Sequence, residues 1–426
     1  MTNLINDTLQ LAQAIEQYVI DIRRELHENP EISGEEVRTT KLITQELDKL
    51  NLEYEIIPNG GIISIIEGDH PGKSIVLRGD IDALPMKEEK TNLKGPKEVV
   101  SKIDTAAHMC GHDGHTAMLL GSAKILAENK DKINGKVILA FEQGEENWRG
   151  IYNLMQRLTK IGADGVWGIH LKADLPSGKI SVDSGPRMAS SFIFNVIIKG
   201  KGGHGARPDL ASTPVDVFTD FYNNLKSMRM NMLDPFQTIT FSIGSVQAGS
   251  VANTVPETLQ FNGTFRFLHY EQGLRAEKEF KRILKNICEL HHCEFEYVVE
   301  PKAMNLIVNN QEECATIALG AVKKALGEER IANHPAWMAS ETFAFYQKYF
   351  PGTFAFLGVK NPEKGTGADN HNPHFDIDED VLKLGVASTV QYALDFLNSE
   401  EQINFVPEQL SVKEVAIEAG LIEIDK

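Results

Sequence analysis

The chain has 426 residues, enough for two hydrophobic cores, and its 42% hydrophobic and 24% charged residues are ordinary for a globular protein. Sixty acidic residues outnumber 43 basic ones, and the net charge of −17 disfavours nucleic acids and anionic membranes as partners. No apolar run approaches the roughly 18 residues that a membrane-spanning helix needs. We therefore expect a small molecule as the partner.

The N-terminal stretch, residues 1–30, places leucine and isoleucine at helical spacing and has no basic head followed by an apolar block. It predicts an amphipathic helix and not a signal peptide, so we expect a cytoplasmic protein. The four cysteines form no CxxC pair, which suits a reducing compartment. Cys288, Cys293 and Cys314 are expected to be plain buried thiols.

From Leu52 onward, short apolar runs alternate with a helical pattern, which predicts an α/β fold with a mixed central sheet flanked by helices. The expected elements are strands at 52–57, 61–68, 73–79, 136–143 and 165–171, with a helix at 114–130. The alternation resumes after Asn305 and closes with a helix over 378–398.

The residues between these two parts show strand, helix, two antiparallel strands, helix and strand, which is the ferredoxin-like α+β signature. These elements are expected at 192–203, 211–228, 237–250, 257–267, 269–292 and 293–300. We therefore predict a catalytic domain in two pieces, an inserted lid or dimerisation domain, and an acidic tail with a short helix at 412–420. The predicted bounds are 1–186 and 303–398 for the catalytic domain, 187–302 for the insertion and 399–426 for the tail.

Polar residues interrupt the apolar pattern where predicted elements begin or end. RGDIDALP follows SIVL, FEQGEE follows KVILA, GIHL ends a strand, and HNPHF precedes the last helix. Open α/β sheets bind ligands beyond the carboxyl ends of their strands. These stretches and HMCGHDGH, residues 108–115, are therefore expected to meet in one crevice.

Histidine and cysteine are soft metal ligands, so HMCGHDGH indicates a metal site. Cys110 and His112 are expected in the loop before a helix that starts near Asp113, where both can point at one centre and a thiolate can bridge two ions. Glu145 and Glu146 are adjacent, so their side chains diverge, and one can bind metal while the other acts as general base.

Two further imidazoles, His170 and His371, and an acid that could orient a ligand, Asp80 or Asp82, complete the candidate set. Each residue alone has a plainer interpretation, as a hydrogen-bonded core histidine, a solvated acidic pair or a small buried thiol. Their joint occurrence at successive strand ends favours the metal site. A GxGxxG match at 200–205 is a weak dinucleotide signal, because a proline follows where a helix would be starting.

Several motifs, taken in this order, resemble those of the metal-dependent N-acyl-amino-acid amidohydrolases. They are RGDIDALP, HMCGHDGHTAMLLGSAKIL, the EE pair, GIHL, GPRMASS, GKGGHGARP, NTVPE, NGTFR and HNPHF. That family contains aminoacylases, hippurate hydrolase and the plant hydrolases of indole-acetyl amino acid conjugates. The resemblance runs from about Leu11 to Leu397, and it implies two metal ions and an inserted lid domain that often forms a homodimer.

The resemblance also implies a role for each matching residue. The implied metal ligands are Cys110 (bridging), His112, Glu146, His170 and His371. Glu145 would be the general base and Asp82 a supporting acid beside the metals. His204 would reach the site of the partner subunit and bind the developing oxyanion, while Asn253 and Arg266 would hold the substrate carboxylate.

Three departures from the family pattern bear on the substrate. Gly144 stands in FEQGEEN where a proline and an alanine are common, and Phe192 replaces an aspartate after MASS. The segment 87–102 is lysine-rich and unlike the family. His108, His115 and His374 have no assigned role.

The sequence therefore predicts an amidohydrolase that splits N-acyl or N-aroyl amino acids into a carboxylic acid and an amino acid, with metal-activated water and Glu145 as general base. One alternative is a metallo-dipeptidase or carboxypeptidase acting on free peptides, and another is a non-catalytic, metal-binding ligand sensor. The expected cofactor is two divalent ions per subunit, zinc or manganese, with cobalt and nickel as further options.

Overall fold

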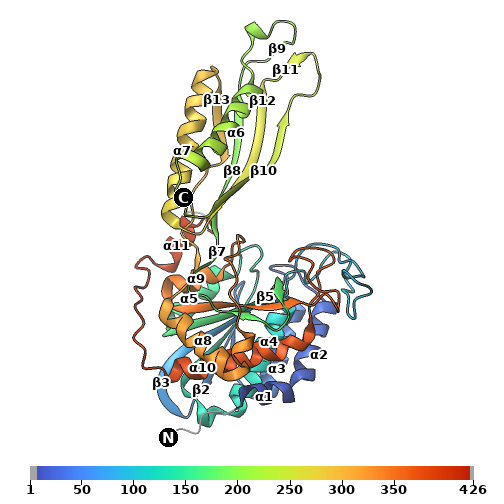
Figure 1. The fold of residues 1–426 in the computed structure, drawn as a ribbon, viewed down its shortest axis with the longest axis vertical. Coiled ribbons are helices and arrows are strands. Elements are labelled where there is room, and N and C mark those ends of the chain that lie inside the picture. The colour runs from blue at the N-terminus through green and yellow to red at the C-terminus, as the bar shows by residue number, and fades with distance from the viewer. Residues whose placement is uncertain (1–6, 423–426) are drawn as a thin grey trace. The chain divides into compact units, whose positions relative to one another are not determined.

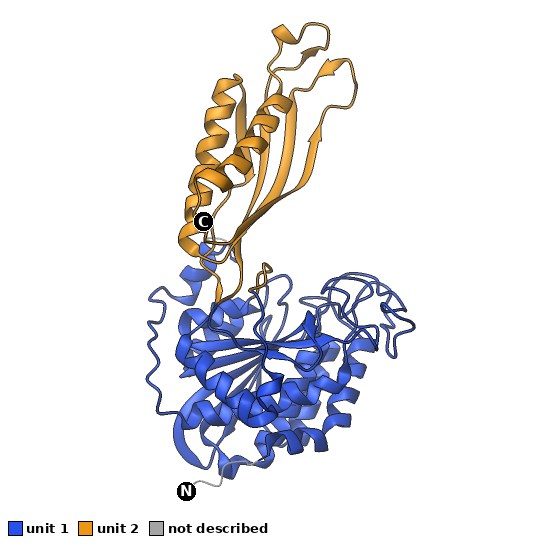
Figure 2. Cartoon of the chain, viewed as in Figure 1, with its two compact units in different colours: residues 1–185, 309–335, 342–426 blue, residues 186–308, 336–341 orange. Residues whose placement is uncertain are grey.

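The computed structural model describes residues 7–422 and divides into two compact units (Figure 2). Unit 1 comprises residues 1–185, 309–335 and 342–426, and unit 2 comprises residues 186–308 and 336–341. The first six residues of the predicted N-terminal helix and the last four of the predicted tail lie outside the described residues.

Unit 2 extends beyond the predicted end of the insertion at residue 302. Ala303 is buried in the core of unit 2, and the stretch 303–308 belongs to this unit. The backbone N–H of Ala189 donates to the carbonyl oxygen of Trp337 at 3.1 Å, which adds the stretch 336–341. Both stretches join unit 2 through contacts with distant parts of the chain. A local sequence pattern cannot predict such contacts.

Unit 1 is built around a seven-stranded mixed sheet with the order β1-β2-β4-β3-β5-β15-β6 (Figure 1). The pairs β3-β4, β3-β5 and β5-β15 are parallel, and the outer pairs are antiparallel. The strands are β1 (Tyr54–Ile57), β2 (Gly61–Glu67), β3 (His70–Asp80), β4 (Asn134–Glu142), β5 (Gly165–Pro176), β6 (Ile180–Ser181) and β15 (Gly352–Lys360). The four parallel strands therefore end at one edge, as the predicted α/β fold requires.

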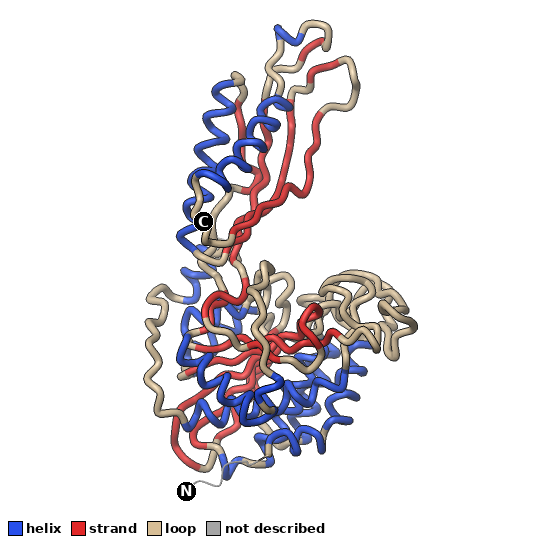
Figure 3. The backbone as a smooth tube through the Cα atoms, in the orientation of Figure 1, coloured by secondary structure: helices blue, strands red, loops and turns tan. Residues whose placement is uncertain are grey.

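Helices pack on both faces of this sheet (Figure 3). On one face lie α1 (Thr8–Ala14), α2 (Glu16–Glu28), α4 (His112–Glu128), α8 (Glu312–Leu326) and α10 (Leu382–Asn398), with α3 (Val37–Lys49) beside α4. The other face carries α5 (Ile151–Ile161) and α9 (Phe343–Tyr349). Burial on both faces explains why β15 is buried throughout except at Lys360 and is apolar over most of its length. Short 3₁₀ turns are η1 (Lys130–Lys132), η2 (Pro208–Leu210), η3 (Glu328–Arg330) and η4 (Glu379–Val381).

Unit 2 has a four-stranded antiparallel sheet with the order β10-β12-β8-β13 and two helices. Its main elements are β8 (Ser190–Lys199), α6 (Pro214–Asn231), β10 (Ile239–Ala248), β12 (Thr258–Phe267), α7 (Tyr270–Leu290) and β13 (Glu294–Val299). Two short strands, β9 (Gly203–His204) and β11 (Thr254–Val255), pair separately. The remaining strands, β7 (Gly185–Met188) and β14 (Val308–Asn310), lie where the chain passes between the units.

The acidic tail contains the predicted short helix, α11 (Val412–Glu418), which packs against α5. Ser411 and Glu414 begin it with a reciprocal capping box. The predicted burial of Cys288, Cys293 and Cys314 is also confirmed. Within residues 7–422, no helix combines the length and apolar character that a membrane crossing needs.

Phe280→Ala is expected to destabilise unit 2 by about 3–5 kcal/mol, because it opens a cavity in an aromatic core. Phe280 is fully buried, and its ring centroid lies 4.7 Å from that of Phe194 and 5.0 Å from that of Phe221. Urea unfolding followed by circular dichroism measures the loss. Phe236→Ala, at a side chain 95% exposed in the same unit, is the control and should leave the transition unchanged.

Candidate metal centre

The predicted site residues of unit 1 meet at the edge where the parallel strands end. Strands β3, β4, β5 and β15 run in the same direction, so the segments that follow them leave from one side of the sheet. The segments are the end of β3 with Asp80 and Asp82, the start of α4 with Cys110 and His112, the turn after β4 with Glu145 and Glu146, β5 with His170, and the loop after β15 with His371.

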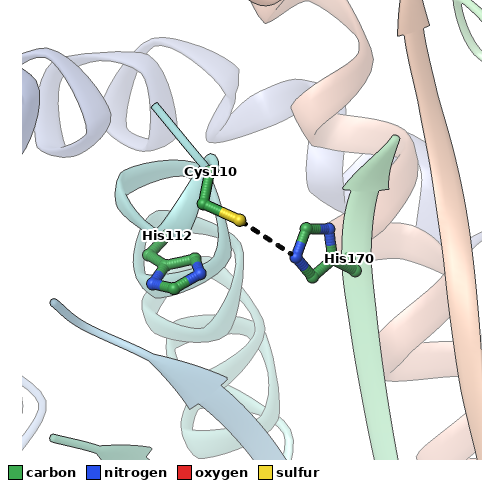
Figure 4. A group of neighbouring side chains, drawn as sticks. All are labelled: Cys110, His112 and His170. Carbon is green, nitrogen blue, oxygen red and sulfur yellow. Dashed lines mark hydrogen bonds between the residues drawn. The ribbon is translucent and has the colours of Figure 1, made fainter. Parts of the chain in front are cut away.

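Side chains from these segments form two donor sets that share one sulfur atom. The first donor set is Cys110, His112 and His170 (Figure 4), and the second donor set is Cys110, Glu146 and His371. Within each set the donor atoms lie within 4.8 Å of one another. Each donor set has the residue types and spacing to hold one cation, and Cys110 is common to both sets.

Gly111 lets Cys110 and His112 face the same point. Its φ of 95° lies in the left-handed region, and a Cβ at this position would lie 3.2 Å from side-chain atoms of Leu171. Gly111 is the N-cap of α4, so His112 is the first residue of the helix. The prediction that His112 lies in the loop before a helix starting near Asp113 is therefore wrong by one residue.

Asp82 fixes two of the candidate ligands. Its Oδ1 lies 3.0 Å from Nδ1 of His112, and its Oδ2 accepts the backbone N–H of Glu146 at 3.0 Å. Burial would raise the pKa of Asp82, but the hydrogen bond from His112 lowers it, so the carboxylate accepts. Nδ1 of His112 therefore donates to Asp82, and this bond turns Nε2 toward the centre.

His170 presents its Nε2 to the thiol of Cys110. Its Nδ1 donates to the carbonyl oxygen of Leu171 at 2.8 Å, which leaves Nε2 3.6 Å from Sγ of Cys110 (Figure 4). A tetrahedral zinc ion holds a sulfur and a nitrogen ligand about 3.6 Å apart. The observed spacing therefore suits an ion bound by both atoms.

Two buried ligand atoms form no hydrogen bond within residues 7–422, and a bound cation would satisfy both of them. Nε2 of His112 and Oε1 of Glu146 form no hydrogen bond with any described residue. A buried nitrogen without a hydrogen bond, such as Nε2 of His112, costs about 1–3 kcal/mol. Nε2 of His371 lies 3.2 Å from the same oxygen of Glu146. One thiol, three imidazoles and one carboxylate fit a divalent transition metal.

Without a cation, the shared thiol stays protonated. Burial raises the pKa of Cys110 well above its ordinary value, and the charge of Glu146 adds to the effect. Coordination to a cation deprotonates a thiol. Metal binding at Cys110 is therefore coupled to release of its proton.

Glu145 lies beside the donor sets and is held by hydrogen bonds that do not involve Asp82. It is 6% exposed, and its Oε1 accepts the backbone N–H of Thr342 at 3.1 Å. The Thr342 hydroxyl accepts a hydrogen bond from Arg78 at 2.8 Å. Arg78 also binds Asp80 and Glu142, each at 2.7 Å. The donor atoms of His112, Glu145 and Glu146 lie within 4.8 Å of one another, so Glu145 faces the centre.

His115 is a site residue to which the sequence pattern gives no role. Its Nδ1 donates to Oδ1 of Asp80 at 2.6 Å, and its Nε2 accepts the backbone N–H of Leu171 at 2.8 Å. Both ring nitrogens are occupied, so His115 positions the peptide beside His170 and does not bind metal. The sequence did contain a signal for this role, because a spacing of three residues places His112 and His115 on one face of α4.

The other two unassigned histidines lie outside both donor sets. His108 is buried, neither ring nitrogen bonds to a described residue, and burial lowers its pKa to about 4. Nδ1 of His374 lies 2.8 Å from the carbonyl oxygen of Thr91.

The three predicted site residues of unit 2 lie near opposite ends of its sheet. His204 belongs to β9, and the backbone N–H of Gly205 donates to the carbonyl oxygen of Asn253 at 2.8 Å. Arg266 lies near the far end of β12, roughly 25 Å along the strand. Within one chain, unit 2 therefore brings His204 and Asn253 together but not Arg266.

The chain matches the model of the peptidase family M20/M25/M40 over residues 76–395, more than half of its length. A match of this extent, on a mixed α/β fold with these donor sets, shows that the chain belongs to this family of hydrolases that act on amide and peptide bonds. The predicted resemblance to the amidohydrolases is thereby confirmed.

Relatives of known name match nearly the whole chain. Thermostable carboxypeptidase 1 of Saccharolobus solfataricus is 35% identical, with 90% of this chain and 96% of that protein aligned. N-acetylcysteine deacetylase of Bacillus subtilis is 33% identical, with 87% and 95% aligned. The solved structure of Bacillus subtilis YXEP, a dinuclear metal binding peptidase, is 30% identical with a TM-score of 0.76, and the match covers 90% of this chain and 99% of that one.

Asp82→Asn is expected to weaken divalent-metal binding about 10–100-fold, because the amide no longer provides the charged acceptor that orients His112. Competition between the protein and a chromophoric chelator for zinc measures the change. The control is Asp69→Asn, because Asp69 is exposed and directly precedes the first residue of β3, at the end of the strand away from the site. Equal affinity in the Asp82 variant and the control would contradict the orienting role.

Proposed function

We propose that this chain is a dinuclear-metal amidohydrolase that cleaves the amide bond of N-acyl or N-aroyl amino acids to a carboxylic acid and a free amino acid. The observation that carries the proposal is the position of Glu145 beside two donor sets that share Cys110. In the proposal, Cys110 would contribute to holding both ions, together with His112 and His170 for one and with Glu146 and His371 for the other. Asp82 is the supporting acid.

When bound, two divalent ions, zinc or manganese with cobalt and nickel as further options, lower the pKa of a shared water and polarise the amide carbonyl. Glu145 accepts a proton as water attacks the amide carbon and returns it to the leaving nitrogen. Thr342 supports this role because its backbone N–H holds one carboxylate oxygen at 3.1 Å. A base fixed in this way needs little reorganisation during the reaction.

The substrate class rests on a feature common to N-acyl amino acids and to the ends of peptides. Both carry a free carboxylate next to the scissile amide. Arg266 and Asn253 are proposed to bind it, since a guanidinium fork bonds both carboxylate oxygens. The name of the Saccharolobus solfataricus relative, a carboxypeptidase, favours a second candidate in which the same centre hydrolyses free peptides.

The proposal includes a cytoplasmic homodimer formed through unit 2, in which His204 and Asn253 reach the partner's site, His204 to bind the oxyanion and Asn253 to bind the carboxylate with the Arg266 of that site. The support for a shared site is that His204 and Asn253 lie at the opposite end of unit 2 from Arg266. All four cysteines are free thiols, which suits a reducing compartment.

Glu145→Gln is expected to retain two metal ions and to lose amide hydrolysis by about 10²–10⁴-fold, because glutamine cannot accept the proton. Metal content by elemental analysis and kcat/KM over a panel of N-acyl amino acids and dipeptides measure the two effects. Glu67→Gln, at an exposed end of β2, is the control. Undiminished turnover of the variant would show that Glu145 is not the base. A higher kcat/KM of the wild-type protein for dipeptides than for N-acyl amino acids would favour the peptidase candidate.

Mixing two inactive variants tests the shared site. His204→Ala and Glu145→Gln homodimers are each expected to be inactive, whereas the mixed dimer contains one site with both residues intact. Random reassociation should restore about a quarter of the wild-type activity. Recovery measured after a cycle of dissociation and reassembly would support the arrangement, and no recovery in confirmed mixed dimers would contradict it.

A further inference from the structure

The lysine-rich segment, residues 87–102, lies against the loop that carries His371. We call residues 361–378, which follow β15, the His371 loop, and the two loops lie together beside α2 in Figure 1. Hydrogen bonds between them include Glu89 N–H to Pro373 O (3.0 Å), Leu93 N–H to Gly365 O (3.0 Å) and Asn92 Nδ2 to Asp376 Oδ2 (2.8 Å). The segment therefore contacts the loop at several points along its length.

His371 needs support from its surroundings. Its φ of 65° is in the left-handed region, which costs a non-glycine residue about 1–3 kcal/mol, and its side chain is 50% exposed. On one side, Nδ2 of Asn370 donates to the carbonyl oxygen of Cys110 at 3.1 Å. On the other side, Nζ of Lys97 donates to the carbonyl oxygen of Pro373 at 3.2 Å. The loop is thus anchored on both sides of His371.

Lys97 is a fully buried lysine, which is unusual for a side chain in a lysine-rich segment. Its Nζ lies 2.7 Å from Oε1 of Glu88, and the same oxygen lies 3.0 Å from Nε2 of His27. Burial would raise the pKa of Glu88, but hydrogen bonds from His27 and Lys97 lower it to about 2. The carboxylate therefore stays charged and fixes Lys97 in place.

The same charged network continues to the start of α4. Nδ1 of His27 lies 2.8 Å from Oδ2 of Asp113, and Nε of Arg23 lies 2.7 Å from that oxygen. These side chains are each 1% exposed. Asp113 directly follows His112, so buried charges run without a gap from the His371 loop to the helix that carries His112.

We propose that Lys97 is a positioning residue for the metal centre, holding the His371 loop at Pro373 and tying it through Glu88 to the start of α4. The inference rests on the metal ligands of the proposed function. His371 of the second donor set depends on this loop, whereas His112 and His170 of the first donor set are fixed by Asp82 and the peptide of Leu171. Without Lys97 the start of α4 is still held at Asp113 by Arg23 and His27, so the second donor set is weakened selectively.

Lys97→Met tests this, because methionine fills similar space without the ammonium group. Metal-free protein is titrated with Co²⁺ and followed by visible absorption and equilibrium dialysis. One of the two ions is expected to bind about tenfold or more weakly, while the other keeps its wild-type affinity and thiolate absorption band. Lys87→Met is the matched control, since Lys87 is 70% exposed and pairs only loosely with Asp104 at 3.5 Å.

A second variant guards against misfolding. Lys97→Met leaves the buried carboxylate of Glu88 short of a partner, so the double variant Glu88→Gln with Lys97→Met removes both charges. It still lacks the bond to Pro373, and the same selective loss is expected. Two ions bound with wild-type affinity by both variants would overturn the proposal, and so would an equal weakening of both ions.

His371→Ala separates this inference from the proposed ligand set. If His371→Ala and Lys97→Met weaken the binding of the same ion, the proposed ligand set and the positioning role of Lys97 are both supported. If His371→Ala weakens one ion and Lys97→Met weakens none, the ligand set stands and the positioning role falls. If His371→Ala binds both ions normally, the ligand set itself is wrong, and the role of Lys97 falls with it.

Discussion

Sγ of Cys110 belongs to both donor sets, and this shared atom constrains where the other elements of the centre lie. The start of α4 has to approach β5 on one side and the His371 loop on the other. Gly111 permits the first approach, because a side chain there would crowd Leu171. The contact between the start of α4 and the His371 loop is held by the N–H of His371, which donates to the carbonyl oxygen of Met109 at 2.7 Å. The centre is therefore set largely by backbone contacts around one cysteine.

The longer strands of unit 1 could be predicted from the sequence, whereas the two-residue strand β6 was not predicted. A sheet covered on both faces has continuous apolar strands, so a polar residue such as Asp80 marks where the sheet edge begins. The predicted strand end at residue 171 is wrong, because β5 continues to Pro176 and His170 lies within the strand. The start of α4 differed by one residue, because the left-handed conformation of Gly111 has no signature in the pattern. The order of strands could not be predicted, since β15 lies between β5 and β6, which both precede it by more than a hundred residues.

Other features depend on contacts across long stretches of chain. His115 accepts a hydrogen bond from Leu171, 56 residues away, and Lys97 reaches Pro373 across 276 residues. A lysine-rich run is normally solvated surface, so nothing in the sequence marks Lys97 as buried. In unit 2, by contrast, the order of the main elements could be predicted because each follows from a short local pattern. The positions of His204 and Arg266 relative to one another follow only from the strand register.

The place of β15 in the sheet bears on the order in which the chain folds during synthesis. Strands β5 and β6 emerge before unit 2, and β15, which pairs with both of them, emerges after it. Until then both strands have an unpaired edge, which favours association with other chains. The His371 loop follows β15, so the second donor set is complete only when almost the whole chain has left the ribosome. In the proposed ligand set, the second ion can therefore bind only late in synthesis.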